Sequence, residues 1–474
     1  MKIIGKEFKK IIISFGFFTL VILFPLFAMQ AETTFKHSVD SSGEQEFGSM
    51  APVGLLLQWQ QDPTTTMTID WHTTDSQRNP ELEYQELNDE EWHTVQSTSI
   101  GFPFSKDRII HRVELTNLMP ATKYRFRVPG VERPYKFRTM PDNVNKPIRF
   151  ATGGDTHVGE EFRKTNRLVA QYDPEFVLWG GDLAYANGDP RQIERWYDWF
   201  DGIMESLITP TNRMIPVLVT IGNHEVFKYE RLERSGADLT EPMRKWGLED
   251  RSARFFYNIF AMPGSKGWGV LDFNDYMSIF LLDSNYGIGT TNPGEPQTKW
   301  LKNALAERRN KPHLFPVYHA PAYPSVRSME KKAHPRVRNN WAPLFQKNRV
   351  RVAFENHDHT YKRTYPMRDG EIHATGVVYI GDGAWGDVGV REIASRQEIG
   401  RDDLTEDEYN HWFRDGAEWP FYIKKGKSVR HFILVTIHGP HQHFIMIDNN
   451  NNVIDEYPAT SRPETLKSIT EEFD

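Results

Sequence analysis

The stretch GGDLAY occupies Gly180 to Tyr185 and directly follows an apolar run, Phe176 to Trp179. A short run of this kind predicts a buried strand. Asp182 then stands at the end of the strand, with the phenol of Tyr185 three residues later, and both side chains are well placed to hold a metal ion. We interpret the rest of the chain as the fold that supports this site, the segments that substrate passes to reach it, and a signal for export.

Four further polar stretches follow apolar, strand-like runs in the same way. They are GGDTH at Gly153 to His157, GNHE at Gly222 to Glu225, FPVYHAP around His319, and NHDH at Asn356 to His359. The pattern around them predicts strands at 148–153, 176–179, 214–221, 277–282, 314–318, 350–354 and 377–380, a helix ending at 166–172 and another at 298–309. This order predicts a layered α/β domain whose polar side chains gather where strands end.

The five stretches together contain enough ligands for two divalent or trivalent cations. The candidates are Asp155, Asp182, the amide oxygen of Asn223, His157, His319, His357 and His359. With one carboxylate shared between two ions, such a set can clamp a phosphoryl group and turn a bound water into hydroxide. Each stretch alone is weak, because a strand-end aspartate is often a helix cap and a lone histidine is more often a core or surface residue. Their ordered combination is what indicates a metal site.

The composition is that of a globular chain of two or three domains, with 474 residues of which 39% are hydrophobic. A net charge of −7 argues against an extended nucleic-acid-binding surface, although the net charge of a whole chain does not reveal a local basic patch. Because the chain has no cysteine, disulfides and sulfur-ligated zinc are excluded.

The N-terminal segment has the pattern of an export signal. Four lysines, the last of them Lys10, precede an uncharged run from Ile11 to Met29. Residues 1–31 are therefore expected to be a signal peptide, or an N-terminal anchor if they are not cleaved, because the run is close to the length that spans a bilayer. We expect a secreted or periplasmic protein, with a polar linker at 32–50.

Residues 51–140 show the alternation of half-buried strands, which predicts a small β-sandwich. In one strand Met67, Ile69 and Trp71 alternate with Thr68, Asp70 and His72. The string LMPATKYRFRV, Leu118 to Val128, resembles a fibronectin type III domain, where a tyrosine folds back onto the preceding turn. Trp71 is similar to the core tryptophan of that all-β fold.

The order of the five stretches resembles the calcineurin-like metallophosphoesterases, and GDLAYANG followed by GNHE is most similar to the purple acid phosphatase branch. The resemblance extends to residues 255–284 and to a C-terminal hairpin at 430–457. It implies an αββα sandwich, which we place at residues 146–460, C-terminal to the fibronectin-like domain.

The resemblance also implies roles for single residues. One metal would be held by Asp155, Asp182, His359 and one further group, and the second by Asp182, Asn223, His319 and His357, so that Asp182 bridges the two. His224 would stabilise the transferred phosphoryl oxygens or protonate the leaving oxygen. Glu225 is then in position to tune His224, or is a helix-start or surface carboxylate.

The further group at the first metal is where this chain departs from the family pattern. Purple acid phosphatases have glycine where this chain has His157, and bind iron through the tyrosine of GDxxY, here Tyr185; the wider superfamily has the histidine and no tyrosine. Tyr185 as ligand implies Fe(III) with a divalent Fe, Zn or Mn, whereas His157 implies two divalent ions. We favour Tyr185 and leave His157 as an alternative or indirect ligand. Two smaller departures are Asn356, where glycine is usual, and Pro316, where valine is usual.

Residues on the substrate side are harder to predict. The basic loop after His319, with Arg327, Lys331, Lys332 and His334, either meets a phosphate or is simply solvated. Two insertions, 226–254 and 386–427, are placed to cover the site, and the second contains the acidic run DDLTEDE, which would disfavour large polyanions. His438, His441 and His443 alternate along a hairpin and are not expected to bind metal.

These observations predict an exported enzyme that cleaves phosphoester bonds by in-line attack of a metal-activated hydroxide, with acid phosphatase action on small phosphomonoesters as the first choice. The alternatives are a phosphodiesterase or nucleotide-cleaving enzyme of the same superfamily, and a surface binding module whose hydrolase domain is inactive.

Overall fold

The computed structural model describes residues 52–74, 80–131, 133–228, 252–265, 267–285, 296–331, 333–393, 405–414 and 417–458. The expected leader at 1–31, the linker at 32–50 and parts of both insertions lie outside these residues. None of the described helices has the length and mean hydropathy that crossing a bilayer requires.

The first eight strands form an all-β sandwich of two four-stranded antiparallel sheets. Their orders are β1-β2-β6-β5 and β4-β3-β7-β8, the arrangement of an immunoglobulin-like sandwich. The strands are β1 (Gly54–Gln58), β2 (Met67–Thr73), β3 (Glu81–Glu86), β4 (His93–Gln96), β5 (Thr98–Gly101), β6 (Ile109–Leu115), β7 (Lys123–Arg127) and β8 (Tyr135–Arg138). Trp71 is fully buried between the sheets, and the Tyr124 hydroxyl accepts a hydrogen bond from Met119 N at 2.9 Å.

The second face of β2 is buried as well, so the prediction of a half-buried strand is wrong there. Thr68, Asp70 and His72 are at most 1% exposed. Asp70 binds the Arg112 guanidinium at 2.8 and 2.6 Å, and Arg112 also donates to Ile259 O in the following domain at 2.7 Å. The polar residues of β2 therefore belong to a joint between two domains.

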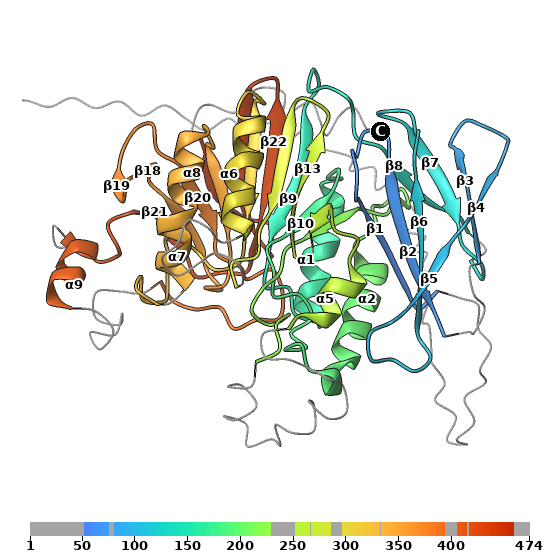
Figure 1. The fold of residues 1–474 in the computed structure, drawn as a ribbon, viewed down its shortest axis with the longest axis horizontal. Coiled ribbons are helices and arrows are strands. Elements are labelled where there is room, and N and C mark those ends of the chain that lie inside the picture. Colours follow the sequence, from blue (N-terminus) through green and yellow to red (C-terminus); the bar gives the residue numbers. More distant parts are fainter. Residues whose placement is uncertain are drawn as a thin grey trace, which may run out of the picture. The chain divides into compact units, whose positions relative to one another are not determined.

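The remaining described strands form an αββα sandwich (Figure 1). One sheet has the order β11-β10-β9-β22-β23-β24 and the other β12-β13-β14-β15-β16-β20-β17-β21, with a separate β18-β19 ribbon. The strands are β9 (Ile148–Gly153), β10 (Val177–Trp179), β11 (Val217–Val219), β12 (Gly264–Ser265), β13 (Trp268–Phe273), β14 (Met277–Leu281), β15 (His313–Val317), β16 (Val352–Glu355), β17 (Tyr361–Thr364), β18 (Met367–Arg368), β19 (Glu371–Ile372), β20 (Val378–Gly381), β21 (Ile423–Lys427), β22 (His431–His438), β23 (His441–Asp448) and β24 (Val453–Tyr457).

Helices cover the outer face of each sheet (Figure 1). They are α1 (Glu160–Gln171), α2 (Glu194–Ser206) and α5 (Arg254–Ile259) on the six-stranded sheet, and α6 (Pro296–Arg308), α7 (Ala333–Asn340) and α8 (Ala342–Lys347) on the other, with a short 3-10 turn at Pro190–Gln192. The short helix α9 (Glu406–Trp412) lies at the left of Figure 1 and packs Tyr409 and Trp412 into the same hydrophobic cluster as α6 to α8. Between the sheets, Phe150 stacks on Phe176 and meets Phe315 edge-on. The predicted α/β fold class is confirmed.

Pro316 lies in the middle of β15, and its effect is local. β15 pairs with β14 along five residues but with β16 only through Val317 and Phe354. Because proline has no N–H to donate, a full ladder on both sides is not available. The strand still ends where His319 is needed.

His313 on β15 is expected to make the fold sensitive to acid. Its Nε2–H donates to Gly439 O at 2.8 Å, and its Nδ1 accepts from Gln442 at 3.1 Å, so the ring is bound as the neutral form. Burial lowers the pKa of His313 to about 4. Because this is below the ordinary value near 6.5, the unfolded chain binds the proton more tightly, and stability is full above pH 6.5 and lost as pH falls from 6.5 to about 4, by about 3 kcal/mol.

Thermal unfolding of His313→Gln across pH 4 to 7 checks this expectation. The melting temperature of the variant should fall less steeply with acid than that of the parent, whereas His93→Gln, on the exposed part of β4, should leave the slope unchanged. Equal slopes in all three proteins would contradict the expectation.

Candidate metal centre

The five polar stretches meet at the carboxyl ends of neighbouring strands. Asp155 follows β9, Asp182 follows β10 and Asn223 follows β11 in one sheet, with these three strands parallel. His319 follows β15, and the pair His357 and His359 follows β16, in the other. In an α/β sandwich this edge is where ligands bind. The structure thus brings together residues that are up to about two hundred positions apart in the chain.

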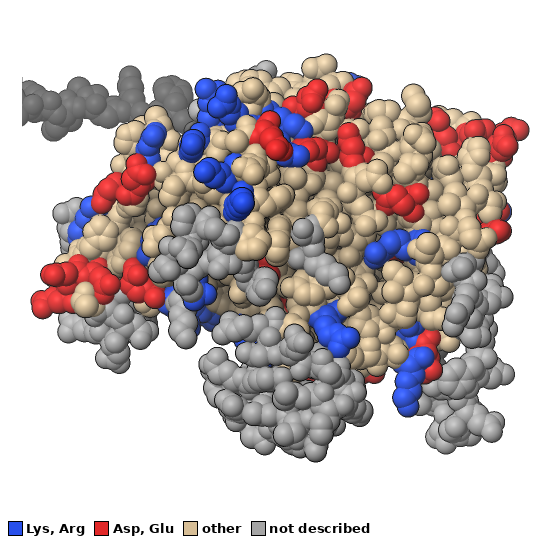
Figure 2. Space-filling model, in the orientation of Figure 1, with Lys and Arg blue, Asp and Glu red and all other residues tan. Residues whose placement is uncertain are grey.

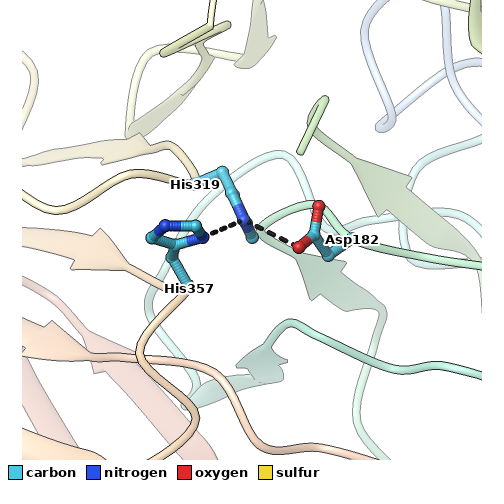
Figure 3. A group of neighbouring side chains, drawn as sticks. All are labelled: Asp182, His319 and His357. Carbon is cyan, nitrogen blue, oxygen red and sulfur yellow. Dashed lines mark hydrogen bonds and ion pairs between the residues drawn. The ribbon is translucent and has the colours of Figure 1, made fainter. Parts of the chain in front are cut away.

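One group of donor atoms surrounds His319 Nε2 (Figure 3). This nitrogen lies 3.0 Å from Asp182 Oδ2, 3.3 Å from Asn223 Oδ1 and 2.9 Å from His357 Nδ1. His319 Nδ1 donates to Gly180 O at 3.0 Å, so Nε2 is the nitrogen left for the site. Carboxylate, amide and imidazole atoms that converge in this way fit a divalent cation.

The electrostatics of this group also suit a cation. Burial lowers the pKa of His319, but Asp182 and Asp155 outweigh it and raise the value to about 9. Burial raises the pKa of Asp182, but His319 and His224 hold it well below its usual range. A proton on His319 therefore balances the buried carboxylate in the metal-free protein, and a bound cation takes over that charge.

A second group of donor atoms adjoins the first. Asp155 Oδ1 lies 3.1 Å from the Tyr185 hydroxyl and 3.0 Å from His359 Nε2, and the hydroxyl is 3.1 Å from the same nitrogen. His359 Nδ1 donates to Gly389 O at 3.1 Å, which again leaves Nε2 for the site. The other oxygen of Asp155 accepts from the His357 backbone N at 2.9 Å and so ties the two groups together. Burial raises the pKa of Tyr185 well above its ordinary value, helped by Asp155, so a phenolate here needs a strong cation.

His157 is close to this second group, but its nitrogens are engaged elsewhere. Nδ1 donates to Val158 O at 2.9 Å, and Nε2 accepts from the Arg195 guanidinium at 2.7 Å. Its ring lies against that of Tyr185, with centroids 4.9 Å apart. The structure therefore places the tyrosine oxygen, and not a His157 nitrogen, beside Asp155 and His359.

The His224 ring also packs against the Tyr185 ring, at a centroid distance of 4.2 Å. Its Nδ1 is 2.6 Å from Asn187 Oδ1 and its backbone N donates to Asp182 Oδ1 at 2.7 Å. Nε2 is then the nitrogen on the side of Asp182 Oδ2, 3.9 Å away. Asn187 received no role from the sequence, although it belongs to the quoted GDLAYANG.

Glu225 is neither a surface carboxylate nor a contact of the His224 ring. It is 1% exposed and accepts three backbone hydrogen bonds, from Gly222, Asp182 and Leu183, at 2.7 to 2.8 Å. Burial, and then the charge of Asp182, raise the pKa of Glu225 to about 8. Its contacts fix the backbone turn that presents Asp182.

The backbone at the site is held in an unusual conformation. Asp155, His157, Asp182, Tyr185, His357 and His359 all have positive φ angles, between 53° and 89°. For residues other than glycine this costs on the order of 1–3 kcal/mol each and persists where the surroundings enforce it, as at functional sites.

Asn356 explains one glycine in each of the pairs that open GGDTH and GGDLAY. Its side chain is 1% exposed and donates to Tyr318 O at 3.1 Å. A Cβ at Gly180 would lie 1.6 Å from Asn356 Nδ2, and one at Gly154 would lie 2.5 Å from Oδ1. The departure from glycine at Asn356 is therefore accommodated by the strand ends opposite it.

Gly222→Ala is expected to displace Asp182. A Cβ at Gly222 would lie 2.2 Å from both Asp182 N and Oδ1, closer than any real contact, so the turn must shift. We expect metal affinity to fall on the order of 10–100-fold, as for other changes that misplace a ligand. Metal titration checks this, with Gly101→Ala as the control because a Cβ there meets nothing within 4 Å. Equal metal affinity in both variants would contradict the expectation.

Two of the four candidate residues of the loop after His319, Arg327 and His334, have protein partners. Arg327 donates to His357 O at 2.6 Å and pairs with Asp358, and His334 Nδ1 contacts Ser328 O at 2.8 Å. Lys331 is exposed, and Lys332 lies outside the described residues. The acidic run of the second insertion is described only from Thr405, and Glu406 and Asp407 on α9 are exposed. Acidic side chains gather at the left edge of Figure 2, where Figure 1 labels α9.

The three histidines of the C-terminal hairpin have separate environments. His438 contacts Asn145 O at 3.1 Å, His443 contacts Glu456 at 2.7 Å, and His441 is exposed. Among the described residues, the group of acidic and histidine side chains close enough to share an ion is Asp182, His319 and His357.

Comparisons with known proteins identify both domains. The profile "Purple acid Phosphatase, N-terminal domain" matches residues 52–139, and "Calcineurin-like phosphoesterase" matches 148–361. Probable purple acid phosphatase 20 of Arabidopsis thaliana is 28% identical over 67% of this chain and 71% of its own, and purple acid phosphatase 21 is 27% identical over 61% of each. The structure of purple acid phosphatase PPD1 from yellow lupin (Lupinus luteus) has the same fold, with a TM-score of 0.67 at 17% identity over 86% of this chain and 74% of its own. The chain is a metallophosphoesterase of the purple acid phosphatase family, and a hydrolase.

Proposed function

We propose that this metallophosphoesterase is an exported acid phosphatase that hydrolyses small phosphomonoesters with a dinuclear metal centre. The observation that carries the proposal is the convergence of seven donor side chains, from five strand ends, in two adjoining groups. The family implies a dinuclear centre, and the donor types fit hard or borderline cations.

In this proposal each group of donors holds one ion. Asp155, Tyr185, His359 and Asp182 hold the first, and Asp182, Asn223, His319 and His357 the second. Because the Tyr185 oxygen lies with Asp155 and His359, we propose Fe(III) at the first position and divalent Fe, Zn or Mn at the second. When bound, the two ions would neutralise phosphoryl charge and lower the pKa of a water that attacks phosphorus.

The chain's own residues position the substrate and move the proton. His224 Nδ1–H donates to Asn187 Oδ1, so it is the imidazolium form of His224 that carries a proton on Nε2, passes it to the leaving oxygen and becomes neutral. The Tyr185 ring packs against the His224 imidazole and helps to keep it in place. Glu225 holds the turn of Asp182 through backbone amides, so that the carboxylate does not move during the reaction.

Tyr185→Phe is expected to abolish colour. The iron-loaded parent should show a visible phenolate-to-Fe(III) charge-transfer band, because the Tyr185 oxygen is the phenol beside Asp155. The variant should be colourless, and His157→Gln should keep the band. Absorption spectra with metal analysis decide this, and a colourless active parent or a band lost only with His157 would assign the site to His157.

The substrate class is tested by comparing para-nitrophenyl phosphate with its bis ester, using protein loaded with metal. We expect faster turnover of the monoester, because its second negative charge adds attraction to two cations. Faster turnover of the diester would favour the phosphodiesterase alternative. Turnover of neither, with metal bound, would favour a binding module. Export rests on residues 1–31, and cell fractionation of the tagged full chain tests it.

A further inference from the structure

Three arginines lie around the metal centre, and two of them have their guanidinium groups fixed by the protein. Arg195 donates to Ala184 O at 2.8 Å and to His157 at 2.7 Å. Arg327 donates to His357 O and pairs with Asp358. The third, Arg391, makes no side-chain hydrogen bond or ion pair with any residue that the structure describes, although it is half-buried.

The backbone of Arg391 is bound directly to a candidate ligand. Its N donates to His359 O at 3.1 Å, and two residues earlier Gly389 O accepts from His359 Nδ1 at 3.1 Å. Burial, and then the charge of Arg327, lower the pKa of the Arg391 guanidinium, whereas the charges of Asp358, Asp155 and Tyr185 raise it. Arg391 therefore stands beside the candidate first metal position.

The segment that carries Arg391 is fixed along its length. Arg430 donates to Gly386 O at 2.9 Å and to Val388 O at 3.2 Å. Asp387 accepts from Phe162 N at the start of α1 at 2.9 Å. Glu392, the nearest carboxylate in sequence, accepts instead from Ser428 at 2.9 Å. The backbone of residues 386–392, called the strap, is thus held in place, and the acid next to Arg391 accepts from Ser428 instead.

Burial disfavours the charge of Arg391 more than the surrounding carboxylates favour it, since the pKa of the guanidinium is lowered overall. An anion that arrives with the substrate removes that cost. Guanidinium matches the oxygens of a phosphoryl group, which it can bind through two parallel N–H groups. A phosphomonoester carries close to two negative charges near neutral pH and a diester carries one.

We propose that Arg391 binds the phosphoryl group of the substrate and favours phosphomonoester dianions over diesters. The proposal rests on the proposed phosphatase function and names a residue that sets its substrate class. Arg391 then acts on substrate binding, whereas the ligands and His224 act on the reaction itself.

The test compares Arg391→Met, Arg391→Lys and a control, Arg309→Met, which removes an exposed arginine just after α6. The metal-loaded proteins are titrated with inorganic phosphate by calorimetry, and KM and kcat are measured for both nitrophenyl esters. In Arg391→Met we expect phosphate affinity to fall on the order of 10–100-fold, the range for a charge-assisted hydrogen bond. KM should rise more for the monoester than for the diester, lysine should restore part of the loss, and metal content should match the parent.

The outcomes separate this inference from the proposed function. If the parent hydrolyses the monoester and Arg391→Met changes neither KM nor phosphate affinity, the role of Arg391 is overturned and the function stands. A loss of metal in Arg391→Met that accounts for its weaker binding also overturns it, since the residue would then act through His359. If the parent hydrolyses neither ester but Arg391→Met still weakens phosphate binding, the anion site stands and the phosphatase function falls. A metal-loaded parent that binds no phosphate overturns both.

Discussion

Asp182→Asn is expected to lower kcat for para-nitrophenyl phosphate by about 10³-fold or more, from a loss of about 4 kcal/mol of transition-state stabilisation. The substitution keeps the shape of the side chain and the oxygen that accepts from His224 N. It replaces the oxygen near His319 Nε2 with an amide NH₂ and removes the negative charge shared by both candidate ions. Bound metal should therefore fall from two ions per chain to one or none.

Metal analysis and steady-state kinetics on the same preparations check this expectation. Asp173→Asn is the matched control, because that carboxylate pairs with Arg138 and Arg213 away from the metal centre. The control should keep its metal and its kcat. Full hydrolysis and two ions in Asp182→Asn would remove the bridging role and strengthen the idea of a binding module.

The strand framework was predictable because burial leaves a direct mark on sequence. Parallel strands covered on both faces are apolar throughout, and the expected run at 148–153 coincides with β9. Strand ends then follow, since polar residues return where the strand leaves the core. This is why Asp155, Asp182 and Asn223 could be placed at one edge before any coordinates were available.

Side-chain direction was not predictable from spacing. Two positions separate Asp155 from His157, and both have positive φ, so the usual alternation of a strand does not apply to them. The His157 ring is directed by Arg195, which lies 38 residues later. Tyr185 meets Asp155 and His359 through contacts over 30 and 174 residues. Long-range contacts of this kind leave no local pattern.

Polar residues that support the site without being candidate ligands were missed or misassigned for a related reason. Glu225 acts on backbone amides of Asp182 and Leu183, 43 and 42 residues away. Arg391 lies in a segment without strand or helix pattern, where a charged residue is ordinarily solvated. The burial of the second face of β2 was not predictable for the same reason. Asp70 alternates with apolar residues as a surface residue does, yet it is buried at the interface with the next domain.

Lys362→Met is expected to destabilise the protein by about 3–5 kcal/mol, the cost of leaving a buried partner charge uncompensated. Lys362 on β17 is fully buried and donates to Glu355 Oε2 at 2.6 Å, with Asp382 at 3.5 Å. The other oxygen of Glu355 accepts from the Tyr318 hydroxyl at 2.7 Å and from Ala322 N at 2.6 Å. Loss of the ammonium leaves two acids facing each other in the core.

The same network connects Lys362 to the metal centre, so we expect loss of the Lys362 ammonium to weaken metal binding as well. Tyr318 and Ala322 flank His319, and His359 N donates to Asp382 O at 2.7 Å, which places both candidate ligand loops on this one cluster.

Denaturant unfolding of Lys362→Met should show the loss of stability, and metal titration should show weaker metal binding. Lys425→Met, on the exposed face of β21, should change neither. Adding Glu355→Gln to Lys362→Met should recover part of the stability, since it removes one stranded charge. A cost below about 1 kcal/mol for Lys362→Met would mean that the acids in the cluster are already neutral, and that the lysine does not organise the ligand loops.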